Sequence, residues 1–163
     1  MKCCKKIILI AAIVFAVSSC YAQLDKQPAP LNKALLLQLV NKHRSTGCNC
    51  GSQYFAQTTP VVWNDSLELA AHDHALDMYV NIFFSHTGSN GSGIGDRAKR
   101  RNYNWKSLGE NISLGRQTEE DVIKGWMNSP GHCSNIMSPN YKEMGVSRAG
   151  NYWTMVLGSQ SKQ

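Results

Sequence analysis

Apolar residues recur every three to four positions along two early segments of the chain, which is the period of one helix face. The pattern predicts a helix over residues 31–44 and a longer helix that Asn64 caps at its start. The stripe residues of the two helices are Leu35, Leu36, Leu39 and Val40, then Leu67, Ala71, His74, Met78 and Ile82. Because His74 lies on an apolar stripe, we expect it to be a hydrogen-bonded core histidine rather than a ligand.

Apolar runs in the last third of the chain predict strands. Residues 143–147 and 152–157 are expected to pair as a hairpin, with the turn at Gly150 and Asn151. Ile and Leu alternate with polar residues over 109–115, which predicts a short half-buried strand. Helices come first and strands late, without the alternation typical of parallel sheets. The expected fold is therefore α+β with an antiparallel sheet.

A third predicted helix begins at Thr118 and runs into residues 126–137, where the candidate chemistry is concentrated. The Pro-Gly pair at 130–131 is expected to end this helix. His132 and Cys133 follow side by side. Histidine titrates near neutral pH and is the commonest metal ligand, whereas cysteine in an exported chain usually forms a disulfide.

Residues 1–22 have the features of a signal peptide. Three lysines precede an apolar run over residues 7–17, which is shorter than the about 20 residues that span a bilayer. Small residues before Cys20 resemble a bacterial lipobox, which would leave Cys20 lipidated as a membrane tether; cleavage that frees Gln23 is the alternative. Residues 23–30 read as a short linker. Both endings place the mature chain outside the cytoplasm, secreted or lipid-anchored to the cell envelope.

The basic balance of the chain is mild once the signal segment is set aside. Removing its three lysines from the 17 Lys and Arg leaves 14 against 11 acidic residues, a net charge of +3. This balance argues against a nucleic-acid partner. One run of basic residues remains, and we expect it to form a solvated loop, with anion or surface binding as the alternative. The run consists of Arg97, Lys99, Arg100 and Arg101.

Five short motifs occur in the order found in a known superfamily. They are Phe-Ser-His at 84–86, Gly-Glu-Asn-Ile at 109–112, Gly-Trp-Met-Asn-Ser-Pro-Gly-His at 125–132, Glu-Met-Gly-Val at 143–146 and Tyr-Trp at 152–153. Together they resemble the CAP superfamily of cysteine-rich secretory proteins, antigen 5 and plant pathogenesis-related class 1 proteins, especially its bacterial SCP-like branch. The resemblance covers a domain over residues 31–160. It implies an α-β-α sandwich, with an antiparallel sheet of about three strands between helical layers.

The resemblance also implies a central cleft lined by two histidines and two glutamates. His86 and His132 match the histidines, and Glu110 matches the first glutamate. Three residues after the helix tryptophan, where relatives carry the second glutamate, this chain has Ser129. The pair Glu119–Glu120 lies in the same helix, but more than one turn too early to replace it.

These residues lead us to expect an exported binding module for a lipid, a metal or a protein ligand. Two neutral imidazoles and a carboxylate suit Zn²⁺ or another divalent ion, with His86 and His132 as ligands. One alternative is a metal-assisted hydrolase or peptidase that uses His86, Glu110 and His132. Another is a purely structural polar cluster, so enzymatic activity stays an open question. The expected partner is a small-molecule, lipid or cell-envelope ligand.

Three cysteines remain in the expected mature domain, and they are Cys48, Cys50 and Cys133. A bridge between Cys48 and Cys50 would close a strained ring, so Cys133 pairs with one of the two if it pairs at all. The resemblance to the bacterial branch favours Cys50 with Cys133, and Cys48 is the alternative partner. A Zn²⁺ site made by the three cysteines and a histidine is a further alternative, although Cys-x-Cys lacks the usual spacer of structural zinc sites.

Overall fold

Five helices and six strands make up the part of the chain that the computed structural model describes, residues 30–161. In chain order they are α2 Lys33–Thr46, β1 Cys48–Cys50, β2 Gln53–Phe55, β3 Val62–Trp63, α3 Asp65–Asn81, α4 Ile94–Arg100, β4 Trp105–Leu114, α5 Glu119–Met127, α6 Pro130–Met137, β5 Glu143–Ala149 and β6 Tyr152–Gln160. The predicted signal peptide, Cys20 and the linker up to residue 29 lie outside the described residues. No helix within residues 30–161 is long and apolar enough to cross a membrane.

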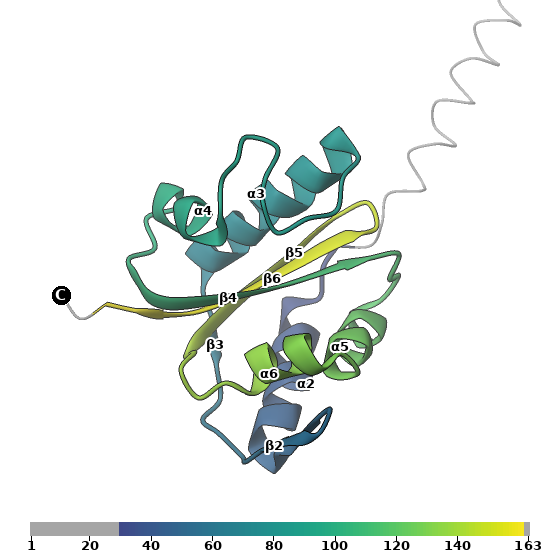
Figure 1. Cartoon of the computed structure of the whole chain (residues 1–163), viewed down its shortest axis with the longest axis vertical. Helices are drawn as coiled ribbons and strands as arrows, with labels where there is room; N and C mark the ends of the chain where they lie inside the picture. The colour runs from purple at the N-terminus through teal and green to yellow at the C-terminus, as the bar shows by residue number, and fades with distance from the viewer. Residues whose placement is uncertain (1–29, 162–163) are drawn as a thin grey trace, which may run out of the picture. The chain divides into compact units, whose positions relative to one another are not determined.

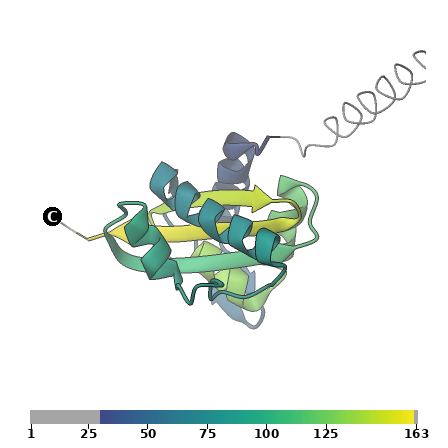
Figure 2. The ribbon, with the colours of Figure 1, turned by 90° about the horizontal axis from the view of Figure 1, so that it is seen from above.

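A four-stranded sheet of order β3-β5-β6-β4 forms the middle layer of the domain. α3 and α4 cover one of its faces, and α2, α5 and α6 lie on the other (Figure 1). Seen from above, α3 runs across the sheet (Figure 2). The predicted α-β-α sandwich is therefore confirmed. The sheet differs in one respect, because β3 adds a fourth strand that pairs parallel to β5.

The longest helix, α3, forms as its sequence pattern predicts, except at Ile82, which follows the helix as its C-cap and is exposed instead of continuing the buried stripe. The Asn64 side chain accepts a hydrogen bond from Leu67 N at 3.1 Å and so caps the first turn. Leu67, Ala71 and Met78 of the apolar stripe are fully buried. The helix lies directly on β5, since a Cβ atom added at Gly145 would come within 2.1 Å of the Glu68 backbone nitrogen. Only glycine permits this close approach.

The sheet is buried on both faces, and β6 shows this best. Trp153, Met155 and Leu157 alternate along the strand and belong to the core between the sheet and the α2, α5 and α6 layer. Val156 faces the other way and packs with Leu67 in the core beneath α3. This alternation follows from the period of two along a strand.

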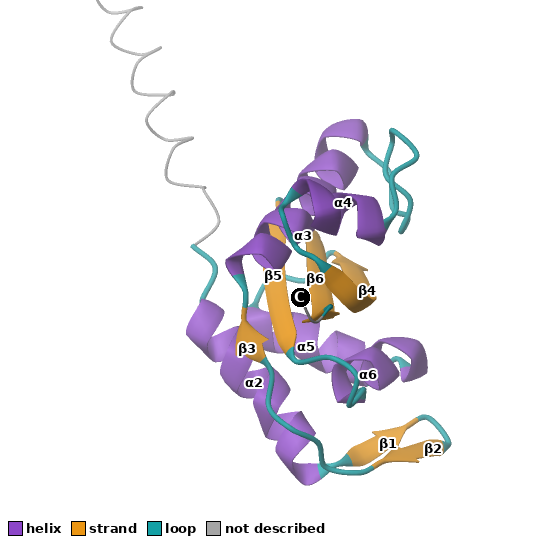
Figure 3. Ribbon diagram, turned by 90° about the vertical axis from the view of Figure 1, so that its left-hand side faces the viewer, coloured by secondary structure: helices purple, strands orange, loops and turns teal. Residues whose placement is uncertain are grey.

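The structure corrects two predictions in adjoining parts of the fold. The sequence of residues 48–60 predicts a loop, but the structure has the antiparallel hairpin β1–β2 there, which stands apart from the main sheet (Figure 3). Pro130 begins helix α6 instead of ending the preceding helix, which already stops at Met127. Proline suits the first position of a helix, because its missing N–H has no partner there. His132 and Cys133 therefore lie in the early turns of a helix rather than in a loop.

Arg44 is a buried cation that joins the end of α2 to the loops around it. Its guanidinium donates to the carbonyl oxygens of Thr59 at 2.8 Å, Ile136 at 2.6 Å, Ser138 at 2.9 Å and Tyr141 at 3.1 Å. Burial lowers the pKa of Arg44 to about 10, so the side chain stays charged at neutral pH. A cation among the last carbonyls of α6 also suits the dipole of that helix.

Candidate functional site

Glu110 is the buried centre of a polar cluster on strand β4. It lies opposite Val156 of β6, and its side chain is 4% exposed. Both carboxylate oxygens have partners: Oε1 is 2.8 Å from His86 Nδ1, and Oε2 is 2.7 Å from Arg97 Nη2. The carboxylate thus connects the edge strand to α4 and to the loop that follows α3.

Arg97 is the cation that compensates the buried carboxylate. Its guanidinium also donates to Ser92 O at 2.8 Å and to His86 O at 3.1 Å, and the residue is 2% exposed. The prediction of a solvated basic loop is therefore wrong for Arg97, although Lys99 and Arg100 are exposed as expected. The sequence did hold a signal for this burial. A glutamate on a strand of a sheet that is covered on both faces needs a buried cation as its partner.

His86 presents its imidazole to solvent. Its side chain is 60% exposed, while Nδ1 faces the Glu110 carboxylate. An ionised carboxylate only accepts hydrogen bonds, so Nδ1 carries the proton and Nε2 of the neutral ring keeps its lone pair. Within residues 30–161 no hydrogen bond to this Nε2 is found. The arrangement fits a metal-binding histidine, whose second nitrogen usually donates to a carboxylate.

His74 lies near the same Glu110 oxygen as His86 and is completely buried. Its Nε2 donates to Ser85 O at 2.8 Å and is 3.8 Å from Glu110 Oε1. Burial lowers the pKa of His74, although the negative charge of Glu110 opposes this shift. The structure thus places a neutral core histidine here, as expected from the apolar stripe.

His132 approaches the cluster from the opposite helical layer and is partly buried. Burial lowers its pKa, and the charge of nearby His86 lowers it further. Both causes favour the neutral imidazole, which is the form that binds metal ions. Of the three residues that the sequence singles out, the structure pairs His86 with Glu110 directly, whereas His132 lies close enough to His86 for its pKa to respond to that histidine.

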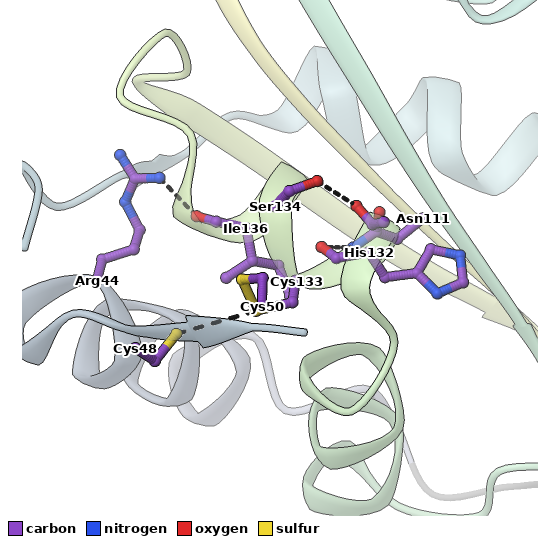
Figure 4. Close-up of a disulfide and its surroundings, with 9 residues drawn as sticks. Arg44, Cys48, Cys50, Asn111, His132, Cys133, Ser134 and Ile136 are labelled. Atoms are coloured by element: carbon purple, nitrogen blue, oxygen red, sulfur yellow. Dashed lines mark hydrogen bonds between the residues drawn. A yellow bond between two sulfur atoms is a disulfide. The ribbon is translucent and has the colours of Figure 1, made fainter. Parts of the chain in front are cut away.

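Two asparagines that sequence reasoning did not single out position His132. Asn111 follows Glu110 on β4 and faces α6, where its Nδ2 donates to His132 O at 3.0 Å (Figure 4). Asn135, one turn further along α6, donates to Asn111 Oδ1 at 2.9 Å and to Glu110 O at 3.2 Å. The Gly-Glu-Asn motif thus contributes one side chain to each helical layer, because successive strand residues face opposite ways.

The second glutamate of the resemblance has no counterpart in this cluster. Ser129 takes the N-cap position of α6, and its side chain makes no capping hydrogen bond. Glu119 accepts a hydrogen bond from Asn32 N at 2.7 Å, so it serves the start of α2 instead. The described site therefore has one carboxylate, and that carboxylate is already paired.

The three cysteines form a second cluster on the other side of α6. Cys50 and Cys133 form a disulfide, whose Cα atoms are 5.4 Å apart, and Cys48 is a free thiol. Cys48 Sγ lies 3.9 Å from Cys133 Sγ, and Figure 4 shows the three sulfur atoms together. Zn²⁺ binding by all three thiolates would require the reduced chain.

A sheet between two helical layers, with a loop histidine paired to a buried glutamate on the edge strand, agrees with the fold and motifs expected of a CAP domain. Residues 37–157 match the family described as "CAP: Cysteine-rich secretory protein family". This match covers more than half of the chain, so the chain belongs to the cysteine-rich secretory protein family.

Similar proteins include bacterial proteins described as extracellular or outer-surface proteins. The chain is 35% identical over 97 residues to the uncharacterized protein YkwD of Bacillus subtilis, a match that covers 58% of this chain and 38% of YkwD. An extracellular SCP-domain protein of Bacillus anthracis superposes with a TM-score of 0.70 at 23% identity, over 81% of this chain and 45% of that one. An outer surface protein of Borrelia burgdorferi superposes with a TM-score of 0.65 at 17% identity, over 79% and 92% of the two chains. The chain thus spans less than half the length of its two Bacillus relatives, and the structural likenesses establish the fold.

Proposed function

We propose that the chain is an exported binding module, and that His86 and His132 hold its ligand. The observation that carries this proposal is the exposed His86 imidazole, which a buried carboxylate fixes in one orientation. A fixed imidazole loses little conformational entropy when it binds. The extracellular and surface relatives support a site of action outside the cytoplasm.

A divalent metal ion such as Zn²⁺ is the ligand that this chemistry favours. His86 offers Nε2 while Nδ1 donates to Glu110, and His132 is held neutral by its surroundings. Zn²⁺ accepts two imidazole ligands and fills its remaining positions with water or a bound ligand. Glu110 would orient His86 and would not bind the metal itself, because both of its oxygens already have partners.

Isothermal titration with Zn²⁺ tests the proposal. Wild-type protein should bind Zn²⁺, and the double variant His86→Ala/His132→Ala should not. His72→Ala is the matched control, since His72 is exposed but lies outside the cluster. Binding that is unchanged in the double variant would remove these histidines as the ligands.

Binding is better supported than hydrolysis. A general base must reach the proton that it removes, yet Glu110 is 4% exposed and is paired with Arg97 and His86. Ser134, a neighbouring hydroxyl, donates to Gly131 O at 2.8 Å. A purely structural role fits one part of the cluster, the buried Arg97–Glu110 pair that joins α4 to β4.

A lipid is the second candidate ligand, and an exposed apolar segment favours it. Val80, Ile82 and Phe84, just before His86, are 62%, 84% and 49% exposed. Ile82 has a positive φ of 54°, which is unusual for a β-branched residue and holds it outward. Co-sedimentation with phosphatidylcholine vesicles tests this candidate, since Ile82→Ser/Phe84→Ser should abolish an effect that His86→Ala leaves intact.

A further inference from the structure

The cysteine cluster combines a disulfide with a thiol at contact distance. Cys48 and Cys50 are two positions apart on β1, so their side chains leave the same face of the strand. That face packs on α6, and the sulfur atoms of Cys48, Cys50 and Cys133 all lie within 4.8 Å of one another. The fold therefore brings two candidate partners to a single cysteine.

We propose that these three cysteines form a thiol–disulfide exchange site, in which Cys48 attacks the disulfide at Cys133 and displaces Cys50. The contact of 3.9 Å joins Cys48 Sγ to Cys133 Sγ, so Cys133 is the sulfur under attack. Cys50 is then the leaving group. The inference is independent of the ligand that the histidines bind.

The exchange is balanced without any outside oxidant. The Cys48 thiol first loses its proton, because the thiolate is the nucleophile. A bond forms between Cys48 and Cys133 as the bond between Cys50 and Cys133 breaks. The electron pair leaves on Cys50, which takes up a proton. The domain keeps one disulfide and one thiol throughout, and only their positions change.

The hairpin that carries the two cysteines is free to make this change. A disulfide bond is about 2 Å shorter than the present Cys48–Cys133 contact, so the two sulfur atoms must approach by a similar amount, through side-chain rotation and movement of β1. β1 pairs only with β2, in a two-stranded sheet separate from the main one (Figure 3). The movement therefore leaves the hydrogen bonds of the four-stranded sheet intact. Burial raises the pKa of the Cys48 thiol, which keeps the resting form protonated.

The Cys50→Ser variant gives the most direct test. Cys48 and Cys133 should then form the disulfide, and tandem mass spectrometry of non-reduced peptides should find it in most molecules. In Cys133→Ser, Cys48 and Cys50 should both stay free. A Cys50→Ser protein that retains the wild-type circular dichroism but has two free thiols would overturn the proposal.

Labelling of the wild-type protein gives an answer even if the variant does not fold. Prolonged treatment of the native protein with N-ethylmaleimide should modify Cys48 in some molecules and Cys50 in others, with one of the two labelled in each. The control is Cys48→Ser, in which Cys50 should remain unlabelled because no thiol attacks the disulfide. Wild-type labelling at Cys48 alone, or labelling of Cys50 in the control, would overturn the proposal.

Discussion

His132 and Cys133 are neighbours on α6, yet they belong to two very different clusters. His132 accepts a hydrogen bond from Asn111 at its backbone oxygen and lies near His86 of the polar cluster, whereas Cys133 joins the sulfur cluster beneath β1. Successive helix residues point about 100° apart, which is how one helix serves both (Figure 4). The polar cluster is held by charge and the sulfur cluster by a covalent bond.

This difference separates the conditions to which each cluster responds. Loss of either partner disturbs the buried pair of Arg97 and Glu110, because either charge alone is costly to bury. The sulfur cluster responds to reductants and to thiol reagents. Variants and solution conditions can therefore perturb the two sides of α6 one at a time.

The largest effect on stability is expected from Cys133→Ser, which removes both possible disulfides. Cys50 and Cys133 are 83 residues apart, and closing a loop of this length contributes about 4 kcal/mol on the chain-entropy model. Urea unfolding should show this loss. Cys50→Ser should lose clearly less, because Cys48 can close nearly the same loop. Equal losses in the two variants would mean that Cys48 gives no such replacement.

Arg97→Met is expected to have the next largest effect. It leaves the Glu110 carboxylate buried without its cation, which costs about 3 kcal/mol in the free energy of unfolding. Lys106→Met, which removes an exposed lysine from the same sheet edge, should change stability by less than about 0.5 kcal/mol. Adding Glu110→Gln to Arg97→Met should restore part of the loss. If Arg97→Met behaves like the control, charge does not hold the polar cluster.

Acidification should lower the free energy of unfolding through His74, the buried histidine of the polar cluster. Burial lowers the pKa of His74 in the folded state, so the unfolded chain binds the proton more readily. The stability contributed by neutral His74 is present above the unfolded pKa of about 6.5 and is lost as the pH falls below it, at up to about 1.4 kcal/mol per pH unit. Urea unfolding across this range should give a shallower loss for His74→Gln. An identical pH profile would remove His74 as the group responsible.

The smallest effect on stability is expected from His86→Ala, although it should have a large effect on binding. The side chain is 60% exposed, so unfolding should change by less than about 0.5 kcal/mol. Zn²⁺ affinity should fall more than about 10-fold in titration calorimetry. A large loss of stability with unchanged Zn²⁺ affinity would assign His86 a structural role instead.

Elements with local signals could be predicted from the sequence. α3 follows from the cap at Asn64 and its apolar stripe, and the β5–β6 hairpin follows from two apolar runs around the turn at Gly150. These signals act between residues that are close in the chain. The family motifs added His86, Glu110 and His132, which no local pattern connects.

The features that escaped prediction depend on distant contacts. β1 and β2 have three residues each, and their place is set by the disulfide to α6 and by packing. Pro130 serves equally to end one helix or to begin another, and only the position of Met127 shows which. Arg97 resembles its solvated neighbours in sequence, because the carboxylate that draws it inward lies on another element.

The strand order has a consequence for how the domain comes to be folded. β6 pairs with both β4 and β5, and it follows every other strand in the chain. Until residues 152–160 have been synthesised, β4 and β5 lack the strand that joins them. The four-stranded sheet, and the packing of both helical layers on it, can therefore be completed only late in synthesis.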